Sequence, residues 1–187
     1  MSECSTRDLG SFEVTSGSII VSDPCYEKDV WCCNSIEQVK CGTWTAEVDI
    51  HDEGEWGWRI AVLRIQAAIP PKVLPSPESA PFAVAVDSGQ AGFFDAMHYR
   101  DSDMLRKQTG SKSTDPDLWY WHCCQITLSP QQAGVLPYGV VSSSGFGDGA
   151  YECLIYRNAC GEAIRVEIIF IEDASENEED WLEDEED

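Results

Sequence analysis

Three loops combine aspartate or serine with glycine, proline or aromatic residues directly after an apolar segment, at residues 21–26, 86–95 and 142–151. Loops that follow core strands are where binding and catalytic groups are usually found. We therefore predict a ligand-binding site in these loops. Its candidate residues are Asp23, Cys25, Tyr26, Asp87, Ser88, Gln90, Ser144, Asp148 and Tyr151.

Four aspartates of these loops, Asp23, Asp87, Asp95 and Asp148, carry the hard oxygen ligands that Mg²⁺ or Ca²⁺ prefers. A metal ion held there would polarise a phosphoryl group or activate a water molecule. The alternative is structural, with Asp23 and Asp148 hydrogen-bonded to their own turns and Asp95 at the start of a helix. No EF-hand motif is present, and we expect no cofactor, with Mg²⁺ or Ca²⁺ held by these aspartates as the alternative.

The nine cysteines predict neither a disulfide framework nor a zinc site. Their number is odd, Cys32 adjoins Cys33, Cys123 adjoins Cys124, and no C-x-x-C spacing occurs. A thiol nucleophile made of Cys25 and a histidine would have no local signature. The G-x-S-x-G motif and the glycine-rich phosphate-binding motifs are also absent. The lack of a complete catalytic motif favours a protein without enzymatic activity.

The chain is strongly acidic, with 34 Asp and Glu against 12 Lys and Arg and a formal net charge of −22. Nucleic acids and anionic membranes attract basic surfaces, so we expect neither as a partner. A membrane helix needs about 18 apolar residues, and no run approaches that length. Residues 1–10 lack the apolar core of a secretory signal. These features predict a cytoplasmic protein with a basic protein partner.

Residues 172–187 contain eleven acidic side chains and no basic one. Like charges at this density repel one another and bury no apolar surface, which predicts a disordered acidic tail. Trp181 and Leu182 form an isolated apolar pair within it. The tail either keeps the protein soluble, docks on a basic partner through Trp181 and Glu183, or imitates a nucleic-acid backbone.

The seven tryptophans are too many for one small core. Trp56 and Trp58 lie two residues apart, so on a strand they share a face, and three acidic residues at 52, 53 and 55 adjoin them. Exposed aromatic side chains beside acidic ones are typical of a surface that binds a basic protein. The predicted partner-binding residues are Trp56, Trp58, Trp181 and Glu183. The alternative is that all seven tryptophans belong to the core.

Most segments alternate between apolar and polar side chains, which is the pattern of half-buried strands. Residues 43–50 and 58–67 are predicted to form a hairpin across the acidic turn between them. In the last third of the chain, residues 151–156 are predicted to form another hairpin with residues 162–171, which are its second strand. Arg165 and Glu167 on this strand are expected to face water.

Two segments have features of helices. Residues 95–108 are predicted to form a helix capped by Asp95. Residues 118–128 fit either a short helix or a strand, because Asp117 suits a helix cap whereas the aromatic side chains suit a strand. The proline-rich segment 70–81 is expected to be an extended connection.

The fold class that follows is mainly β (α+β): a single compact β-sandwich or barrel-like domain of about seven or eight strands with one or two helices. We place a flexible N-terminus at residues 1–11, the β-rich globular domain at residues 12–171 and the disordered acidic tail at residues 172–187.

Three motifs together resemble a known family: S-G-S-I-I-V-S-D-P-C-Y at residues 16–26, V-D-S-G-Q-A-G at 86–92 and G-D-G-A-Y at 147–151. The chain resembles an uncharacterised bacterial and phage family, a domain of unknown function, over residues 12–171. The resemblance implies a domain boundary and a site at these loops, and it implies no activity.

The sequence favours a non-enzymatic acidic interaction protein that binds and inhibits a basic protein, as immunity proteins, antitoxins and other inhibitors do. One alternative is a divalent-metal-dependent hydrolase or ligand-binding protein that uses Asp23, Asp87 and Asp148. Another is a nucleic-acid mimic, whose charges would lie in duplex-like rows.

Overall fold

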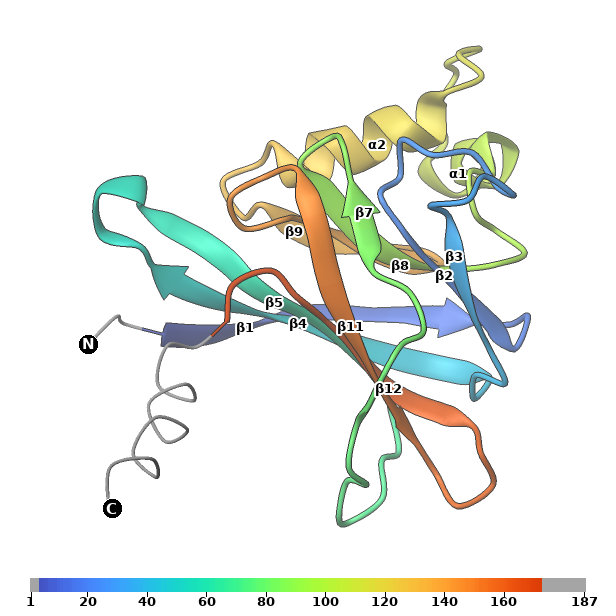
Figure 1. Ribbon diagram of the computed structural model, residues 1–187. Coiled ribbons are helices and arrows are strands. Elements are labelled where there is room, and N and C mark those ends of the chain that lie inside the picture. The colour runs from blue at the N-terminus through green and yellow to red at the C-terminus, as the bar shows by residue number, and fades with distance from the viewer. Residues whose placement is uncertain (1–3, 173–187) are drawn as a thin grey trace, which may run out of the picture.

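The computed structural model describes residues 4–172, which form two antiparallel β-sheets and two α-helices (Figure 1). Strands make up 46% and helices 12% of the structure, and the sheets do not close into a barrel within the described range. The mainly β fold class is therefore confirmed. The structure has twelve strands rather than seven or eight, because it includes several short strands of two to four residues.

The larger sheet has seven strands in the order β1-β4-β5-β12-β11-β6, and β7 also pairs with β11. Its members are β1 (Cys4–Val14), β4 (Gly42–Asp52), β5 (Trp58–Ala67), β6 (Glu78–Ser79), β7 (Val84–Val86), β11 (Gly149–Arg157) and β12 (Ala163–Ile169). Both predicted hairpins are part of this sheet, as β4 with β5 and β11 with β12.

The smaller sheet has five strands in the order β3-β2-β8-β10-β9. Its members are β2 (Ser18–Ser22), β3 (Asn34–Glu37), β8 (Gln90–Asp95), β9 (Ala133–Leu136) and β10 (Gly139–Ser143). The helical elements are η1 (Gly54–Trp56), α1 (Ser102–Thr109) and α2 (Leu118–Thr127). None of these described helices is long and apolar enough to cross a membrane.

The main core lies between the two sheets. Trp44, Ala46 and Val48 point into it from β4, as their alternation predicts, and Phe93 enters from β8. Ile50 is only partly buried, because the pairing of β4 with β5 shifts register at this residue. The same alternation leaves the polar side chains of β4 on the outer face of the larger sheet.

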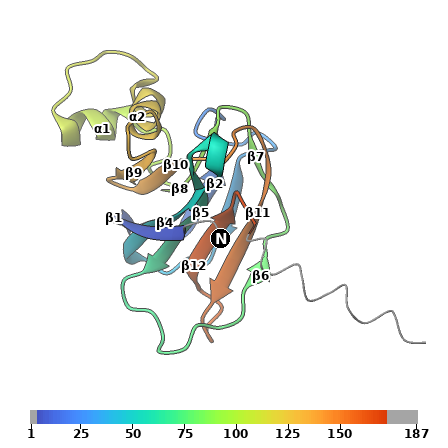
Figure 2. The ribbon, with the colours of Figure 1, turned by 90° about the vertical axis from the view of Figure 1, so that its left-hand side faces the viewer.

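A second, smaller core lies beneath the two helices on the other face of the smaller sheet. Phe94 of β8 contacts Trp119 of α2 edge to face, with 4.9 Å between ring centroids, and Leu105 of α1 is buried in the same cluster. Figure 2 shows both helices on the side of β8, β9 and β10, away from β11 and β12. The fold is thus built in three layers: large sheet, small sheet and helices.

The prediction of a flexible N-terminus at residues 1–11 is wrong for residues 4–11. These residues belong to β1, which pairs with β4 from Cys4 opposite His51 to Val14 opposite Gly42. Most of its side chains are exposed, so this edge strand lacks the apolar alternation that reveals a strand in a sequence. Residues 173–187 of the predicted tail lie outside the described residues.

The helix predicted at residues 95–108 begins seven residues later, because Asp95 is the last residue of β8. Asp101 caps α1 instead, since its carboxylate accepts a hydrogen bond from the backbone amide of Met104 at 2.8 Å. The ambiguous segment 118–128 is the helix α2.

Gly92 of β8 is packed too closely for any side chain. A Cβ atom at this position would lie 2.3 Å from the carbonyl oxygen of Val140 and 2.5 Å from the Phe94 ring. We expect Gly92→Ala to lower the free energy of unfolding by about 2 kcal/mol in urea denaturation. Gly134→Ala is the control, because its Cβ would approach only a side-chain methyl group of Ile126, at 3.0 Å. Equal stability of the two variants would contradict this reading.

Candidate functional site

Asp23 joins two of the predicted loops. It follows β2, its side chain is fully buried, and its carboxylate accepts hydrogen bonds from the backbone amides of Cys25 at 2.8 Å, Asp87 at 3.0 Å and Ser88 at 2.7 Å. The Ser88 hydroxyl donates a fourth hydrogen bond at 2.6 Å. The lone pairs that a metal ion or ligand would use are thus occupied by the protein itself.

The third loop meets the second one. The backbone amide of Ser144 donates to the carbonyl of Gly89 at 3.1 Å, and β7 pairs with β11 so that Val86 lies opposite Gly149. Within the third loop, the hydroxyl of Tyr151 donates to the Gly147 carbonyl at 2.6 Å. The three loops therefore do converge, and we call residues 22–26, 87–90 and 144–151 the loop junction.

Several predicted ligand-binding residues in the loop junction are occupied by structural contacts. Gln90 is 3% exposed and connects β8 to α2, because it donates to the Cys124 sulfur at 3.4 Å and accepts from the Thr127 hydroxyl at 3.1 Å. The Ser144 hydroxyl donates to the Gly147 carbonyl at 2.8 Å.

Burial and the neighbouring Asp23 raise the pKa of the Cys25 thiol to about 12. The thiol therefore stays protonated near neutral pH, so Cys25 lacks the thiolate that a nucleophile requires. Tyr26 donates its hydroxyl proton to the exposed Asp87 at 2.6 Å, and burial together with this hydrogen bond raises the pKa of Tyr26. Neither group is poised for proton transfer at neutral pH.

Asp95 lies outside the loop junction, so the predicted convergence of four aspartates is wrong. It is paired with Ile19 at one end of the β2–β8 ladder, whereas Asp23 follows the other end. Burial raises the pKa of Asp95, but hydrogen bonds from the backbone amides of Ser16, Thr15 and Met97 lower it below its ordinary value.

Asp95 therefore closes a turn after β1 in the way that Asp23 closes a turn after β7. Among residues 4–172, no group of three or more His, Cys, Asp or Glu side chains is arranged to hold a metal ion. The exposed Asp87 follows β7 and the exposed Asp148 precedes β11, and these two strands pair with each other. Asp87 and Asp148 remain the most accessible carboxylates of the loop junction.

Two predicted partner-binding tryptophans lie at the tip of the β4–β5 hairpin. Trp56 of η1 is 68% exposed and Trp58, the first residue of β5, is 47% exposed. Phe146, from the loop between β10 and β11, is 57% exposed and meets Trp56 edge to face, with 6.3 Å between ring centroids. We call Trp56, Trp58 and Phe146 the aromatic patch. Trp181 and Glu183 lie outside the described residues.

The alternative that all tryptophans are buried is wrong, because among the described ones only Trp44 and Trp119 belong to the cores. Sequence reasoning missed Phe146, whose only signal is an aromatic residue between two glycines. A cavity of about 340 Å³ adjoins Trp58 and is also lined by Ile50 and Ile60.

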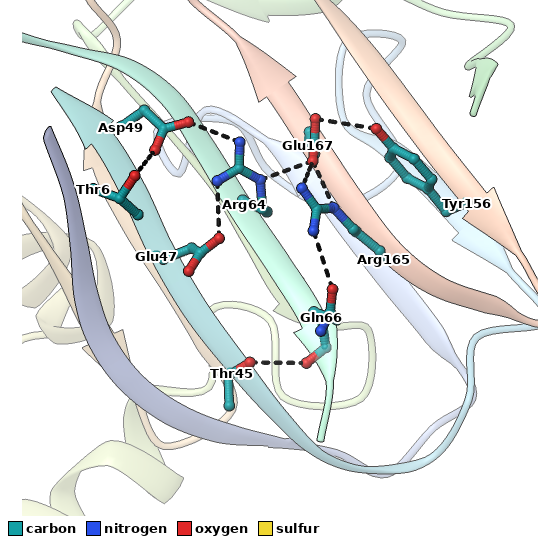
Figure 3. A network of polar contacts seen from close by, with 9 residues as sticks. All are labelled: Thr6, Thr45, Glu47, Asp49, Arg64, Gln66, Tyr156, Arg165 and Glu167. Atoms are coloured by element: carbon teal, nitrogen blue, oxygen red, sulfur yellow. Dashed lines mark hydrogen bonds and ion pairs between the residues drawn. The ribbon is translucent and has the colours of Figure 1, made fainter. Parts of the chain in front are cut away.

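A network of charged side chains covers the outer face of the larger sheet (Figure 3). Arg64 of β5 is its centre, with nitrogen–oxygen distances of 2.8 Å to Glu47, 2.7 Å to Asp49 and 2.8 Å to Glu167. Arg165 of β12 also donates to Glu167, at 2.6 Å from its Nε. The network thus links three neighbouring strands.

Glu167 was predicted to face water, and this is wrong, since the residue is only 5% exposed. It does lie on the outer face, but Arg64 and Arg165 cover it, and Tyr156 approaches within 3.5 Å. Sequence alternation assigns the face of a strand and cannot show which side chains of other strands cover that face.

The network also shifts ionisation equilibria. Burial raises the pKa of Asp49, but hydrogen bonds from Arg64 and Thr6 lower it more, so the pKa of Asp49 lies below its ordinary value. For Arg64, burial lowers the pKa and its three carboxylate partners raise it above the ordinary value. Because both groups stay charged and all three guanidinium nitrogens are engaged, this network is a structural brace of the sheet.

A protein-family model described as "Protein of unknown function (DUF4241)" matches residues 43–168. No curated protein and no solved structure matches the chain. The family match confirms the resemblance to a domain of unknown function that the loop motifs indicate. Two of the three motifs, at residues 86–92 and 147–151, lie within the matched range.

Proposed function

The chain belongs to the family described as protein of unknown function (DUF4241), and we propose that it is a non-enzymatic acidic protein that binds and inhibits a basic protein partner. The aromatic patch carries this proposal. Trp56 and Phe146 come from separate loops and contact each other, yet both remain more than half exposed. Large apolar side chains that gather on a surface mark interaction sites.

The surroundings of the aromatic patch indicate the chemistry of the partner. Asp52, Glu53 and Glu55 belong to the same hairpin tip as Trp56, so a partner that covers the patch would place its side chains against carboxylates. Tryptophan is enriched among the residues that dominate binding energy, and complementary charge speeds association. A formal net charge of −22 adds long-range attraction for a basic protein.

The other candidate functions have less support. A metal-dependent hydrolase would need free carboxylate oxygens, whereas those of Asp23 accept four hydrogen bonds from the protein. A nucleic-acid mimic needs unneutralised rows of negative charge, whereas Arg64 and Arg165 neutralise the carboxylates on the outer face of the larger sheet.

We place this function in the cytoplasm. The eight cysteines from Cys25 to Cys160 are thiols rather than disulfides, and three of them are buried in the cores. Proteins of oxidising compartments that carry many cysteines usually cross-link them, so this pattern suits a reducing compartment.

Co-purification from the native cell with the full chain tests the proposal. We expect the wild type to retain a stoichiometric basic protein at low salt and to release it at high salt. Trp56→Ala is expected to weaken the affinity for that protein at least about tenfold, because the side chain is an anchor of the interface. The complex should also lack the activity that the partner shows alone.

Trp121→Ala is the matched control, because Trp121 is 52% exposed but lies on α2, outside the aromatic patch. It should bind the partner as the wild type does. Retention of the partner by Trp56→Ala at wild-type affinity would remove the patch from the interface. A complex that ignored salt would refute the electrostatic part of the proposal.

A further inference from the structure

The segment between β5 and β6 is an exposed apolar arm, which we call the proline arm (residues 68–77). It contains four prolines, and all its residues except Pro75 are exposed. Ile69 and Val73 are 80% and 81% exposed, although both are large aliphatic residues. Figures 1 and 2 show the arm projecting past the end of β5, below the larger sheet.

Such an arm has a well-defined kind of receptor. Proline-rich segments favour the extended polyproline II conformation. Because they are already extended before binding, they lose little conformational entropy when they bind. Proteins recognise them with surfaces of exposed aromatic side chains. The aromatic patch of Trp56, Trp58 and Phe146 is a surface of this kind, and it belongs to the same chain.

Charge also matches between arm and patch. Lys72 is the single charged residue of the proline arm, which makes the arm locally basic in a chain of net charge −22. Beside the aromatic patch lie Asp52, Glu53 and Glu55. Docking would therefore bring the Lys72 ammonium group toward carboxylates while Val73 and its neighbours cover the aromatic rings.

The arm cannot reach the patch of its own chain. Trp58 is the first residue of β5 and Ala67 is the last, so the two features lie at opposite ends of a ten-residue strand. At a rise of about 3.3 Å per residue they are about 30 Å apart. The arm is held at both ends, by β5 and by β6, and cannot fold back over this length.

We propose that the proline arm of one copy docks on the aromatic patch of a second copy. The contact is heterologous, so each copy offers one free arm and one free patch, and association continues beyond a dimer. The contact area is small, which makes the assembly weak and dependent on concentration. Insofar as the proposed function is correct, a basic partner competes for the same patch, and self-association regulates its access.

Sedimentation equilibrium of the full chain over a concentration series tests this. We expect the average mass to rise past that of a dimer. The mass should rise further at high salt, because screening of the repulsion between chains of −22 charge outweighs the weakened attraction of the single Lys72. Val73→Asp and Trp56→Ala should each keep the chain monomeric. Leu128→Asp is the control, since Leu128 is 86% exposed at the end of α2, and it should associate as the wild type does.

A mixture of the two variants gives the sharpest readout. The Val73→Asp chain retains an intact patch and the Trp56→Ala chain retains an intact arm, so an equimolar mixture should form dimers and nothing larger. A wild type that is monomeric at all concentrations would overturn the proposal. So would association that survives both substitutions, or a mixture that stays monomeric.

The same variants separate this proposal from the proposed function. Val73→Asp leaves the aromatic patch intact, so it should still bind the basic partner, whereas Trp56→Ala should lose both interactions. If the average mass of the wild type rises with concentration but no partner is captured, self-association is supported and the proposed function is rejected. If a strictly monomeric wild type captures a partner, the proposed function is supported and self-association is rejected.

Discussion

Replacement of Asp23 by alanine is expected to lower the free energy of unfolding by about 4 kcal/mol. The carboxylate is fully buried and holds three backbone amides and the Ser88 hydroxyl, which belong to two separate loops. Its removal leaves these donors without partners in a site that alanine cannot fill, and each buried unsatisfied donor costs about 1–3 kcal/mol. Urea denaturation measures the loss as a lower midpoint.

Asp87→Asn is the matched control in the same loop junction. Asp87 is exposed, and its carboxylate accepts one hydrogen bond, from the Tyr26 hydroxyl, that an amide oxygen can also accept. This variant should stay within about 1 kcal/mol of the wild type. A divalent-metal site would make the two aspartates comparable, and both substitutions would then change metal affinity more than stability. Wild-type stability of Asp23→Ala would show that the loops do not depend on this carboxylate.

The Arg64→Met variant should lose about 3–4 kcal/mol of stability near neutral pH. Methionine fills much of the volume of the arginine side chain but leaves Glu47, Asp49 and Glu167 without the cation that neutralises them. Glu167 is only 5% exposed, and Arg165 would then be the one cation left to neutralise its carboxylate. Breaking one side of a buried ion pair is costly because the remaining charge has lost its solvent and its partner.

Acidification should reduce the difference in the free energy of unfolding between the wild type and Arg64→Met. The pKa of Asp49 is lower in the fold than in the unfolded chain, so its carboxylate stabilises the wild type above about pH 4. That contribution is lost as the pH falls through the lower folded value. The variant lacks the part of this contribution that Arg64 supplies and keeps the hydrogen bond from Thr6. We therefore expect the two stability curves to approach each other as the pH falls below about 4.

An exposed ion pair provides the control for this prediction. Glu78→Gln breaks the pair between Arg157 and Glu78, in which the carboxylate side chain is 58% exposed, and should change stability by less than about 1 kcal/mol. If Arg64→Met were as stable as Glu78→Gln at neutral pH, the network on the outer sheet face would contribute nothing to the fold.

Local pattern was sufficient to predict both hairpins of the larger sheet. Residues 58–67 coincide with β5, and residues 43–50 lie within β4. Strict alternation of apolar and polar side chains has a period of two, which only a strand can use to bury one face. The same argument correctly assigned Trp44 and Val48 to the core.

Local pattern failed where long-range contacts decide the structure. Asp95 resembles a helix cap, yet its carboxylate accepts hydrogen bonds from the backbone amides of residues 15 and 16. These residues lie about eighty positions away in the sequence. Residues 4–11 of β1 have few apolar side chains and are ordered by backbone hydrogen bonds to β4, whereas Phe12 and Val14 of the same strand are buried in the main core. Neither contact leaves a signal in neighbouring residues.

For the candidate site, residue types indicated the three loops and the exposed tryptophans of the hairpin tip. They could not show that the carboxylate oxygens of Asp23 already accept hydrogen bonds from the protein, nor that Phe146 completes the aromatic patch from the loop between β10 and β11. Side chains from different strands meet only after the strands have paired.

The sequence by itself determined the β-rich class, the strong negative charge, the hairpins with their buried faces and which residues belong to the three loops. Each of these depends on composition or on neighbours along the chain. The tertiary structure alone decided which carboxylates are structural and which surfaces remain open. That difference has a physical reason: the availability of an oxygen lone pair or an aromatic face depends on what the rest of the chain has already placed against it.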